Sequence, residues 1–174
     1  MSVPSNILQQ FIEAIEEELR LLGQLEQSFE AQLEALRRHD HEALEQAAMQ
    51  TSELVTRLER HQQKRAGKGR LLRRMLKLEL TASTEQLLAA LEARPETQAA
   101  AHTLRGLQQR LQGQLQQTRQ RCESLEFSLK YAIQIGQELL ELLQALDQPA
   151  SRVYTPTGQT RQASPQRSVV NRLG

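Results

Sequence analysis

Apolar residues recur every three or four positions along most of this chain, and that spacing is the period of an α-helix. The first run lies in residues 5–38, where Ser5 follows Pro4 and is suited to cap the start of a helix. The apolar positions of this run are Leu8, Phe11, Ile12, Ile15, Leu19, Leu22, Leu25, Phe29, Leu33 and Leu36. The pattern predicts one long amphipathic helix over residues 5–38.

The middle of the chain holds shorter apolar runs and several start and stop signals. Asp40 is a good N-cap residue and predicts the start of a second helix. Two glycines in residues 64–69 predict that this helix ends there, because glycine destabilises a helix interior. Ser83 followed by Gln86 fits a capping box and predicts that a helix restarts there. The pattern leaves open whether residues 66–95 form one helix or two.

A seven-residue repeat runs through residues 97–147 and predicts the longest helix. Its first line of residues is Leu104, Leu111, Thr118, Leu125, Ala132, Leu139 and Leu146. Its second line, four residues further on, is Leu115, Cys122, Leu129, Gly136 and Leu143. Such a seam is typical of coiled-coil packing. We expect this helix to pack antiparallel against both earlier helices.

These runs predict an all-α fold, an elongated antiparallel bundle of long coiled-coil-like helices over residues 1–147. The low share of aromatic residues, 3%, and of apolar residues, 39%, favours a thin bundle over a sheet protein with a large core. The last 27 residues, 148–174, are rich in Pro, Gly, Ser, Thr and Gln and contain four Arg but no acid. We therefore expect a disordered basic tail over residues 148–174.

Charge is unevenly distributed, and residues 60–77 carry eight basic residues and no acid. The basic residues are Arg60, Lys64, Arg65, Lys68, Arg70, Arg73, Arg74 and Lys77. They could bind phosphates, form a solvated face at a helix–helix turn, or pair with the acidic first helix. No aromatic residue lies among them to stack on bases, which favours the solvated face over nucleic-acid binding.

The sequence shows no motif for catalysis, for a cofactor or for a metal ion. The His39–His41 segment is better explained as a capping turn, because residues two apart on a helix do not face each other. Cys122 falls on the seam, so we expect it to be buried. One cysteine, no signal peptide and no long apolar run predict a cytoplasmic protein without a membrane span.

Residues 125–146 carry more apolar side chains than one seam requires. The additional ones are Phe127, Tyr131, Ile133, Ile135, Leu140 and Leu142. One interpretation is a fully covered stripe in a tight bundle. The other is a face that binds an amphipathic helix of a partner.

The tail segment Val153-Tyr154-Thr155-Pro156-Thr157-Gly158-Gln159-Thr160 resembles the tail of FlgN-type flagellar export chaperones, Tyr-Gly-x-x-Gly-Gln-Thr. Thr155 stands where the family has its first Gly. The segment from Leu36 to Leu44 is similar to the family's polar break followed by Glu-Ala-Leu. The chain departs from the family at residues 122–126, where many members have Asn-x-x-Asn-Gly.

This resemblance implies a cytoplasmic chaperone, and not an enzyme, that binds hook–filament junction proteins through their C-terminal helical segments. Such a chaperone prevents early assembly of these proteins and delivers them to the flagellar type III export gate. The resemblance links the C-terminal helical region to client binding, and the candidate residues are Leu125, Leu129, Ile133, Leu140 and Leu143. It links the tail to docking on the export gate, through Tyr154, Gly158, Gln159 and Thr160.

A different class of function also fits the pattern. The chain could be a structural coiled-coil or adaptor protein that self-associates through the seam of residues 104–146.

Overall fold

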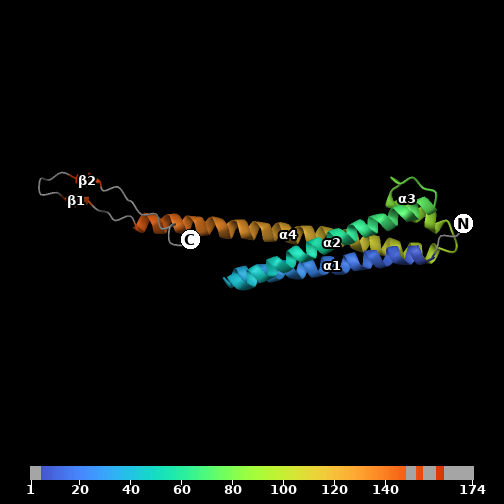
Figure 1. Cartoon of the computed structure of the whole chain (residues 1–174), viewed down its shortest axis with the longest axis horizontal. Helices are drawn as coiled ribbons and strands as arrows, with labels where there is room; N and C mark the ends of the chain where they lie inside the picture. The colour runs from blue at the N-terminus through green and yellow to red at the C-terminus, as the bar shows by residue number, and fades with distance from the viewer. Residues whose placement is uncertain (1–4, 148–151, 155–159, 163–174) are drawn as a thin grey trace. The chain divides into compact units, whose positions relative to one another are not determined.

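The computed structural model describes residues 5–147, 152–154 and 160–162. Its helices are α1 (Ser5–Arg37), α2 (His41–Met75), α3 (Thr84–Glu92) and α4 (Gln98–Asp147), as Figure 1 shows. Two short strands follow, β1 (Arg152–Tyr154) and β2 (Thr160–Gln162). The chain divides into two units, residues 1–126 and 127–174. The prediction of an all-α fold built from long helices is confirmed.

Helices α1 and α2 pack side by side in opposite directions. Near the start of α1, Lys68 Nζ donates to the carbonyl oxygen of Gln10 at 3.1 Å. Further along α1, Ser28 Oγ donates to the carbonyl oxygen of Ala47 at 3.1 Å. Because later residues of α1 meet earlier residues of α2, the pair is antiparallel.

Helix α4 runs parallel to α1, and the expectation that it opposes both earlier helices is wrong. Gln114 contacts Glu26 and Arg121 contacts Glu30, so the two residue numbers rise together. The reason is that α2 ends beside the start of α1, and the short α3 stays at that end of the first unit, as Figure 1 shows. Helix α4 therefore begins there and runs back along α1.

The predicted caps are present. The Asp40 side chain accepts a hydrogen bond from the Ala43 backbone N–H at 3.0 Å and starts α2. Ser83 and Gln86 form a reciprocal capping box, in which each side chain accepts from the other residue's backbone N–H. Residues 66–95 therefore do not form one helix: the first ten complete α2, and α3 follows after a turn.

Helix α2 continues through both glycines to Met75, so the prediction that it ends near residues 64–69 is wrong. Gly69 is buried, and a Cβ atom there would lie 3.4 Å from Phe11 Cε2 and 3.2 Å from Arg73 Nη1. The missing side chain therefore lets α1 approach α2 closely. This packing offsets the low helix propensity of glycine, which costs roughly 0.5–1 kcal/mol.

The apolar core of the first unit lies where the start of α1, the end of α2, α3 and the start of α4 meet. Its buried residues are Leu8, Phe11, Ile12, Ile15, Leu22, Leu72, Leu76, Leu87, Leu88, Leu91, Ala101, Leu104, Leu107 and Leu111. All four helices contribute, and each fully buried Leu or Ile contributes roughly 1.5–3 kcal/mol through the hydrophobic effect.

Polar contacts between α1 and α2 add to this core. Glu18 is fully buried and accepts from Arg65 Nε at 2.5 Å and from Gln62 Nε2 at 3.3 Å. Nearer the end of α1, buried Gln32 donates to Thr51 Oγ1 at 2.6 Å. Buried polar groups with partners fix one register between two helices, because any slip leaves them unpaired.

Strands β1 and β2 were not predicted from the sequence, which led us to expect a disordered tail. They pair antiparallel, with Arg152 opposite Gln162, Val153 opposite Arg161 and Tyr154 opposite Thr160. The remainder of residues 148–174 lies outside the described residues.

The two glycines of α2 offer a matched test of this packing. A Cβ atom at Gly67 would meet nothing within 4 Å. We expect Gly67→Ala to raise the free energy of unfolding by about 0.5–1 kcal/mol through helix propensity. We expect Gly69→Leu to lower it by about 1–3 kcal/mol through overpacking against Phe11, with Gly67→Leu as the control. Urea denaturation measures all three, and equal effects at both positions would contradict this packing.

Candidate protein-binding site

The buried face of α4 in the first unit follows one of the two predicted lines. That line is Leu104, Leu111, Thr118 and Leu125, all at most 7% exposed. The second buried line lies three residues after the first and not four. Leu107 is buried and Gln114 and Arg121 are half-buried, whereas Leu115 and Cys122 are exposed. The predictions that Leu115 packs in the seam and that Cys122 is buried are therefore wrong.

Polar contacts from α1 explain this rotation of α4. Glu26 is buried, and its Oε1 accepts from Gln114 Nε2 and from Thr118 Oγ1, each at 2.7 Å. Arg121 Nε lies 3.6 Å from Glu26 Oε2, and Arg121 also pairs with Glu30. These contacts turn residues 114, 118 and 121 toward α1, so the positions next to them face water.

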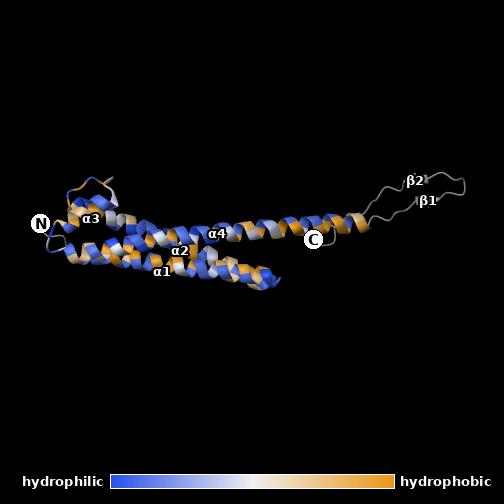
Figure 2. Cartoon of the chain, turned by 180° about the vertical axis from the view of Figure 1, so that it is seen from behind, coloured by the Kyte–Doolittle hydropathy of each residue, from blue (hydrophilic) through white to orange (hydrophobic). Residues whose placement is uncertain are grey.

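From residue 127 onward, the large apolar side chains of α4 are exposed. They are Phe127, Tyr131, Ile133, Ile135, Leu139, Leu140, Leu142, Leu143 and Leu146, with exposed fractions between 39% and 81%. Figure 2 shows that apolar residues continue along α4 to its end. Single exposed apolar residues are ordinary, but a continuous set on one helix marks a surface that binds another molecule.

At 3.6 residues per turn, these side chains lie within about 240° of the helix circumference, with the half-buried Leu129, the small Ala132, Gly136 and Ala145, and two polar residues, Ser128 and Glu138. The remaining strip is polar and consists of Glu126, Lys130, Gln134, Gln137, Glu141 and Gln144. On the apolar side, the rings of Phe127 and Tyr131 lie parallel, with centroids 6.5 Å apart. The apolar residues of 127–146 are called the apolar face of α4 below.

The five residues predicted for client binding do not have the same surroundings. Leu125 is only 6% exposed and belongs to the packed part of the first unit. Leu129 is half-buried, and Ile133, Leu140 and Leu143 are exposed.

Two further residues of this face, Leu139 and Leu146, were predicted to lie in the core seam, but they are 53% and 81% exposed. The heptad pattern does not change at residue 127, so it gives no sign of their exposure. The only signal in the sequence is that residues 125–146 carry more apolar side chains than one seam requires.

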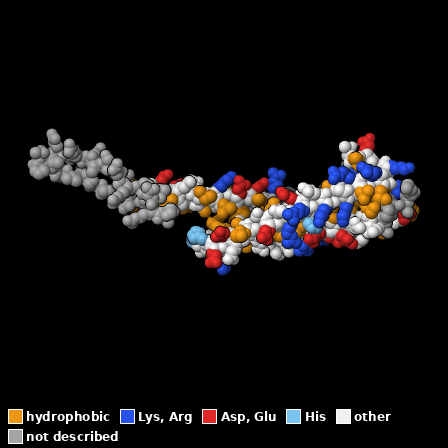
Figure 3. Space-filling model, viewed as in Figure 1, with side chains coloured by type: hydrophobic (Ala, Val, Ile, Leu, Met, Phe, Trp, Pro, Cys, Tyr) orange, Lys and Arg blue, Asp and Glu red, His pale blue; other side chains and the backbone are white. Residues whose placement is uncertain are grey.

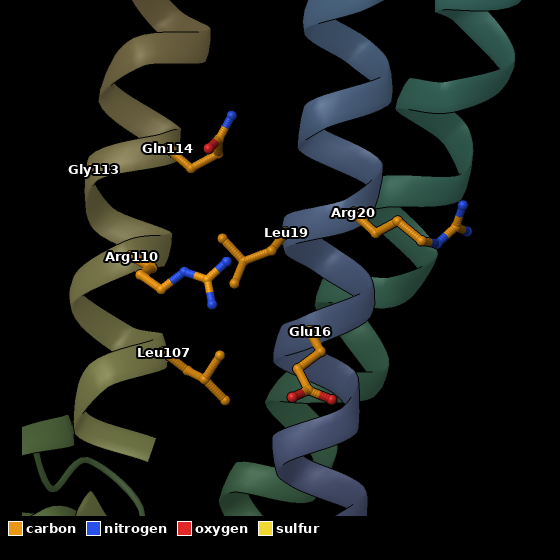
Figure 4. A pocket seen from close by; sticks show the side chains of 7 residues that line it. All are labelled: Glu16, Leu19, Arg20, Leu107, Arg110, Gly113 and Gln114. Atoms are coloured by element: carbon orange, nitrogen blue, oxygen red, sulfur yellow. The ribbon is translucent and has the colours of Figure 1, made fainter. Parts of the chain in front are cut away.

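An open groove lies between α1 and α4 within the first unit, and Figure 4 shows its lining. Leu19 and Leu107 extend into it from the two helices, with Arg110 and Gln114 beside them. Arg20 points away from α4 and pairs with Glu17 at 2.6 Å, and this hydrogen bond lowers the pKa of the Glu17 carboxyl. The described residues of the lining supply no hydroxyl, thiol or imidazole.

The part of the chain that the structure describes contains no group of three or more His, Cys, Asp or Glu placed to hold a metal ion. None of the described helices is both long enough and apolar enough to cross a membrane.

The described tail residues bring two of the predicted docking positions together, because Tyr154 and Thr160 are register partners. Gly158 and Gln159 lie outside the described residues.

A helical bundle with an exposed apolar face on one of its described helices is typical of proteins that hold other proteins. The chain matches the family model described as FlgN protein over residues 1–162, a range that includes the tail motif. It therefore belongs to the FlgN family, which is a family of flagellar export chaperones, as its tail motif had suggested. Comparison with curated proteins and with solved structures gave no match.

The rotation of α4 predicts which thiols react in the folded protein. Cys122 is exposed and should react with a maleimide at a rate close to that of the unfolded chain. In a Cys122→Ser background, we expect Thr118→Cys, at a position only 7% exposed, to react at least about tenfold more slowly. Mass spectrometry of quenched samples gives both rates. Protection of Cys122 with rapid labelling at position 118 would contradict the observed register.

Proposed function

We propose that this protein binds hook–filament junction proteins in the cytoplasm, prevents their early assembly and delivers them to the flagellar type III export gate. Family membership supports the chaperone role in general. The observation that carries the specific proposal is the apolar face of α4, which leaves nine large side chains exposed on one helix. An amphipathic helix from the C-terminal segment of a client would cover such a face.

Estimates of the free energy of binding indicate how much of the apolar face a client must cover. Nine side chains with these exposed fractions would contribute roughly 8–16 kcal/mol if all were removed from water. Association itself costs roughly 4–15 kcal/mol. A client that covered only half of the arc would gain little net free energy. We therefore expect the bound client to cover both the Ile133 side and the Tyr131 side of α4.

Residues Leu129, Ile133, Leu140 and Leu143 form one side of this proposed client surface, and Leu125 marks its boundary with the packed part of α4. Phe127, Tyr131 and Leu142 form the other side. The aromatic pair gives this second side a large contact area with few rotatable bonds, which is typical of residues that dominate binding energy.

The tail is proposed to dock the loaded chaperone on the export gate through Tyr154, Gly158, Gln159 and Thr160. Support comes from the match of these positions to the family motif and from the pairing of Tyr154 with Thr160 across the two strands. The strands place the two ends of the motif next to each other. A tyrosine supplies both an apolar ring and a hydroxyl, so one residue can anchor a small interface.

The client surface is tested by two matched double variants. Ile133→Glu with Leu140→Glu places two charges on the apolar face, and Gln137→Glu with Gln144→Glu places two on the polar strip. We expect the first variant to weaken binding of a purified junction protein at least about a hundredfold, because buried unpaired charges are costly. We expect the second to change binding by less than about threefold.

Calorimetric titration measures both affinities, and circular dichroism checks that both variants remain helical. Equal binding by the two variants would overturn the proposed surface. A wild-type protein that sediments as a stable dimer, with the apolar face covered, would favour the coiled-coil or adaptor function.

Docking on the export gate is tested by Tyr154→Ala and Tyr154→Phe. We expect Tyr154→Ala to retain the junction protein and to lose the export-gate component in a pull-down, because the anchoring side chain is removed. Tyr154→Phe keeps the ring and separates its role from that of the hydroxyl. Loss of the junction protein from Tyr154→Ala would contradict the separation of client binding from docking.

A further inference from the structure

The eight basic residues of segment 60–77 divide into two groups in the structure. Three of them make contacts inside the first unit. Arg65 pairs with Glu18, Lys68 donates to the Gln10 carbonyl oxygen, and Arg73 donates to the Ala82 carbonyl oxygen at 2.7 Å. The other five are Arg60, Lys64, Arg70, Arg74 and Lys77. These five are exposed and make no ion pair or hydrogen bond with the described residues.

Four of these five exposed cations lie on one face of α2. At 3.6 residues per turn, Arg60, Lys64, Arg70 and Arg74 fall within about 120° of the circumference and extend about 21 Å along it. Figure 3 shows Lys and Arg side chains gathered along α2 on the side in view. No acid interrupts this set, which is called the basic stripe below. A concentrated positive surface of this kind attracts a polyanion.

An apolar side chain lies within the arc of the basic stripe. Leu71 falls about 20° inside the edge that Lys64 forms and is 43% exposed, and Leu80, in the turn that follows α2, is 52% exposed. Nucleic acid offers phosphates to the arginines, but an exposed leucine gains little there, and no aromatic side chain is present to stack on bases. An anionic lipid surface binds both kinds of side chain, because its headgroups attract the cations and its acyl boundary takes up the leucine.

We propose that the basic stripe of α2 binds an anionic membrane surface, with Arg60, Lys64, Arg70 and Arg74 at the headgroups and Leu71 at the acyl boundary. The interaction is reversible, because four cations and one leucine give much weaker binding than a membrane-spanning helix. It uses α2, whereas the proposed client and gate contacts use α4 and the tail. Its consequence is a chaperone that can reside on the membrane while both of its other surfaces remain available.

The test measures binding of the full-length protein to lipid vesicles by co-sedimentation. The vesicles are phosphatidylcholine with roughly one-third phosphatidylglycerol, and phosphatidylcholine alone is the uncharged control. We expect binding to the anionic vesicles at about 0.05 M salt, and binding at least about tenfold weaker at about 0.5 M salt, because salt screens the attraction.

Two variants with equal changes in charge locate the interaction. The stripe variant carries Arg60→Gln, Lys64→Gln, Arg70→Gln and Arg74→Gln, and the tail variant carries Arg→Gln at the four tail positions, which are Arg152, Arg161, Arg167 and Arg172. We expect the stripe variant to lose at least about tenfold in vesicle affinity and the tail variant less than about threefold. Both should keep the junction-protein affinity of the wild type.

The inference is overturned if the wild type does not bind anionic vesicles at low salt, or if the tail variant loses more vesicle affinity than the stripe variant. It is also overturned if the stripe binds duplex RNA but not vesicles. A loss of junction-protein affinity in the stripe variant as large as its loss of vesicle affinity would overturn it too. The proposed function is tested separately by the same samples. Vesicle binding without any junction-protein binding would contradict the chaperone function and leave the inference standing.

Discussion

Helix α1 packs against α2 on one side and against α4 on another, and the first unit depends on this double contact. Its buried positions cover about 200° of its circumference. Apolar side chains fill most of these positions, and the buried polar residues Glu18, Glu26 and Gln32 each have a partner. The apolar part supplies the bulk of the stabilisation, while the polar part selects a single register, since a shifted helix would leave Glu18 and Glu26 buried without partners.

The register set by α1 decides which face of α4 is available to a partner. Glu26 turns Gln114 and Arg121 toward α1, so Leu104, Leu111, Thr118 and Leu125 are buried. The same line continues along α4 to Ala132, Leu139 and Leu146, where the side chains are half-buried or exposed. Helix α1 has 33 residues and α4 has 50, so α1 cannot accompany α4 over its whole length. One helix thus serves as a core element of the first unit and carries the proposed client surface in residues 127–146.

Local signals in the sequence were sufficient for the helices and their caps, because an N-cap or a capping box depends on residues within one turn. Asp40 and Ser83 are the examples. Features that depend on distant contacts were missed. Helix α2 passes through Gly69 because Phe11 packs there, and α4 is rotated because Glu26 binds two of its residues. For the candidate site, the sequence identified the excess of apolar residues in 125–146, but the boundary at Leu125 required the packed structure.

We propose that the apolar face of α4 is free in the unbound chaperone and covered when a client binds. Hydrogen–deuterium exchange distinguishes these two states, because amides of a helix segment with few packed side chains open more readily than those of a core. We expect fast exchange in residues 127–147 of the free protein at every concentration, slow exchange in the core part of α4, and strong protection of residues 127–147 on addition of a junction protein. Slow exchange of that segment in the free protein, or no change on addition of the client, would contradict the proposal.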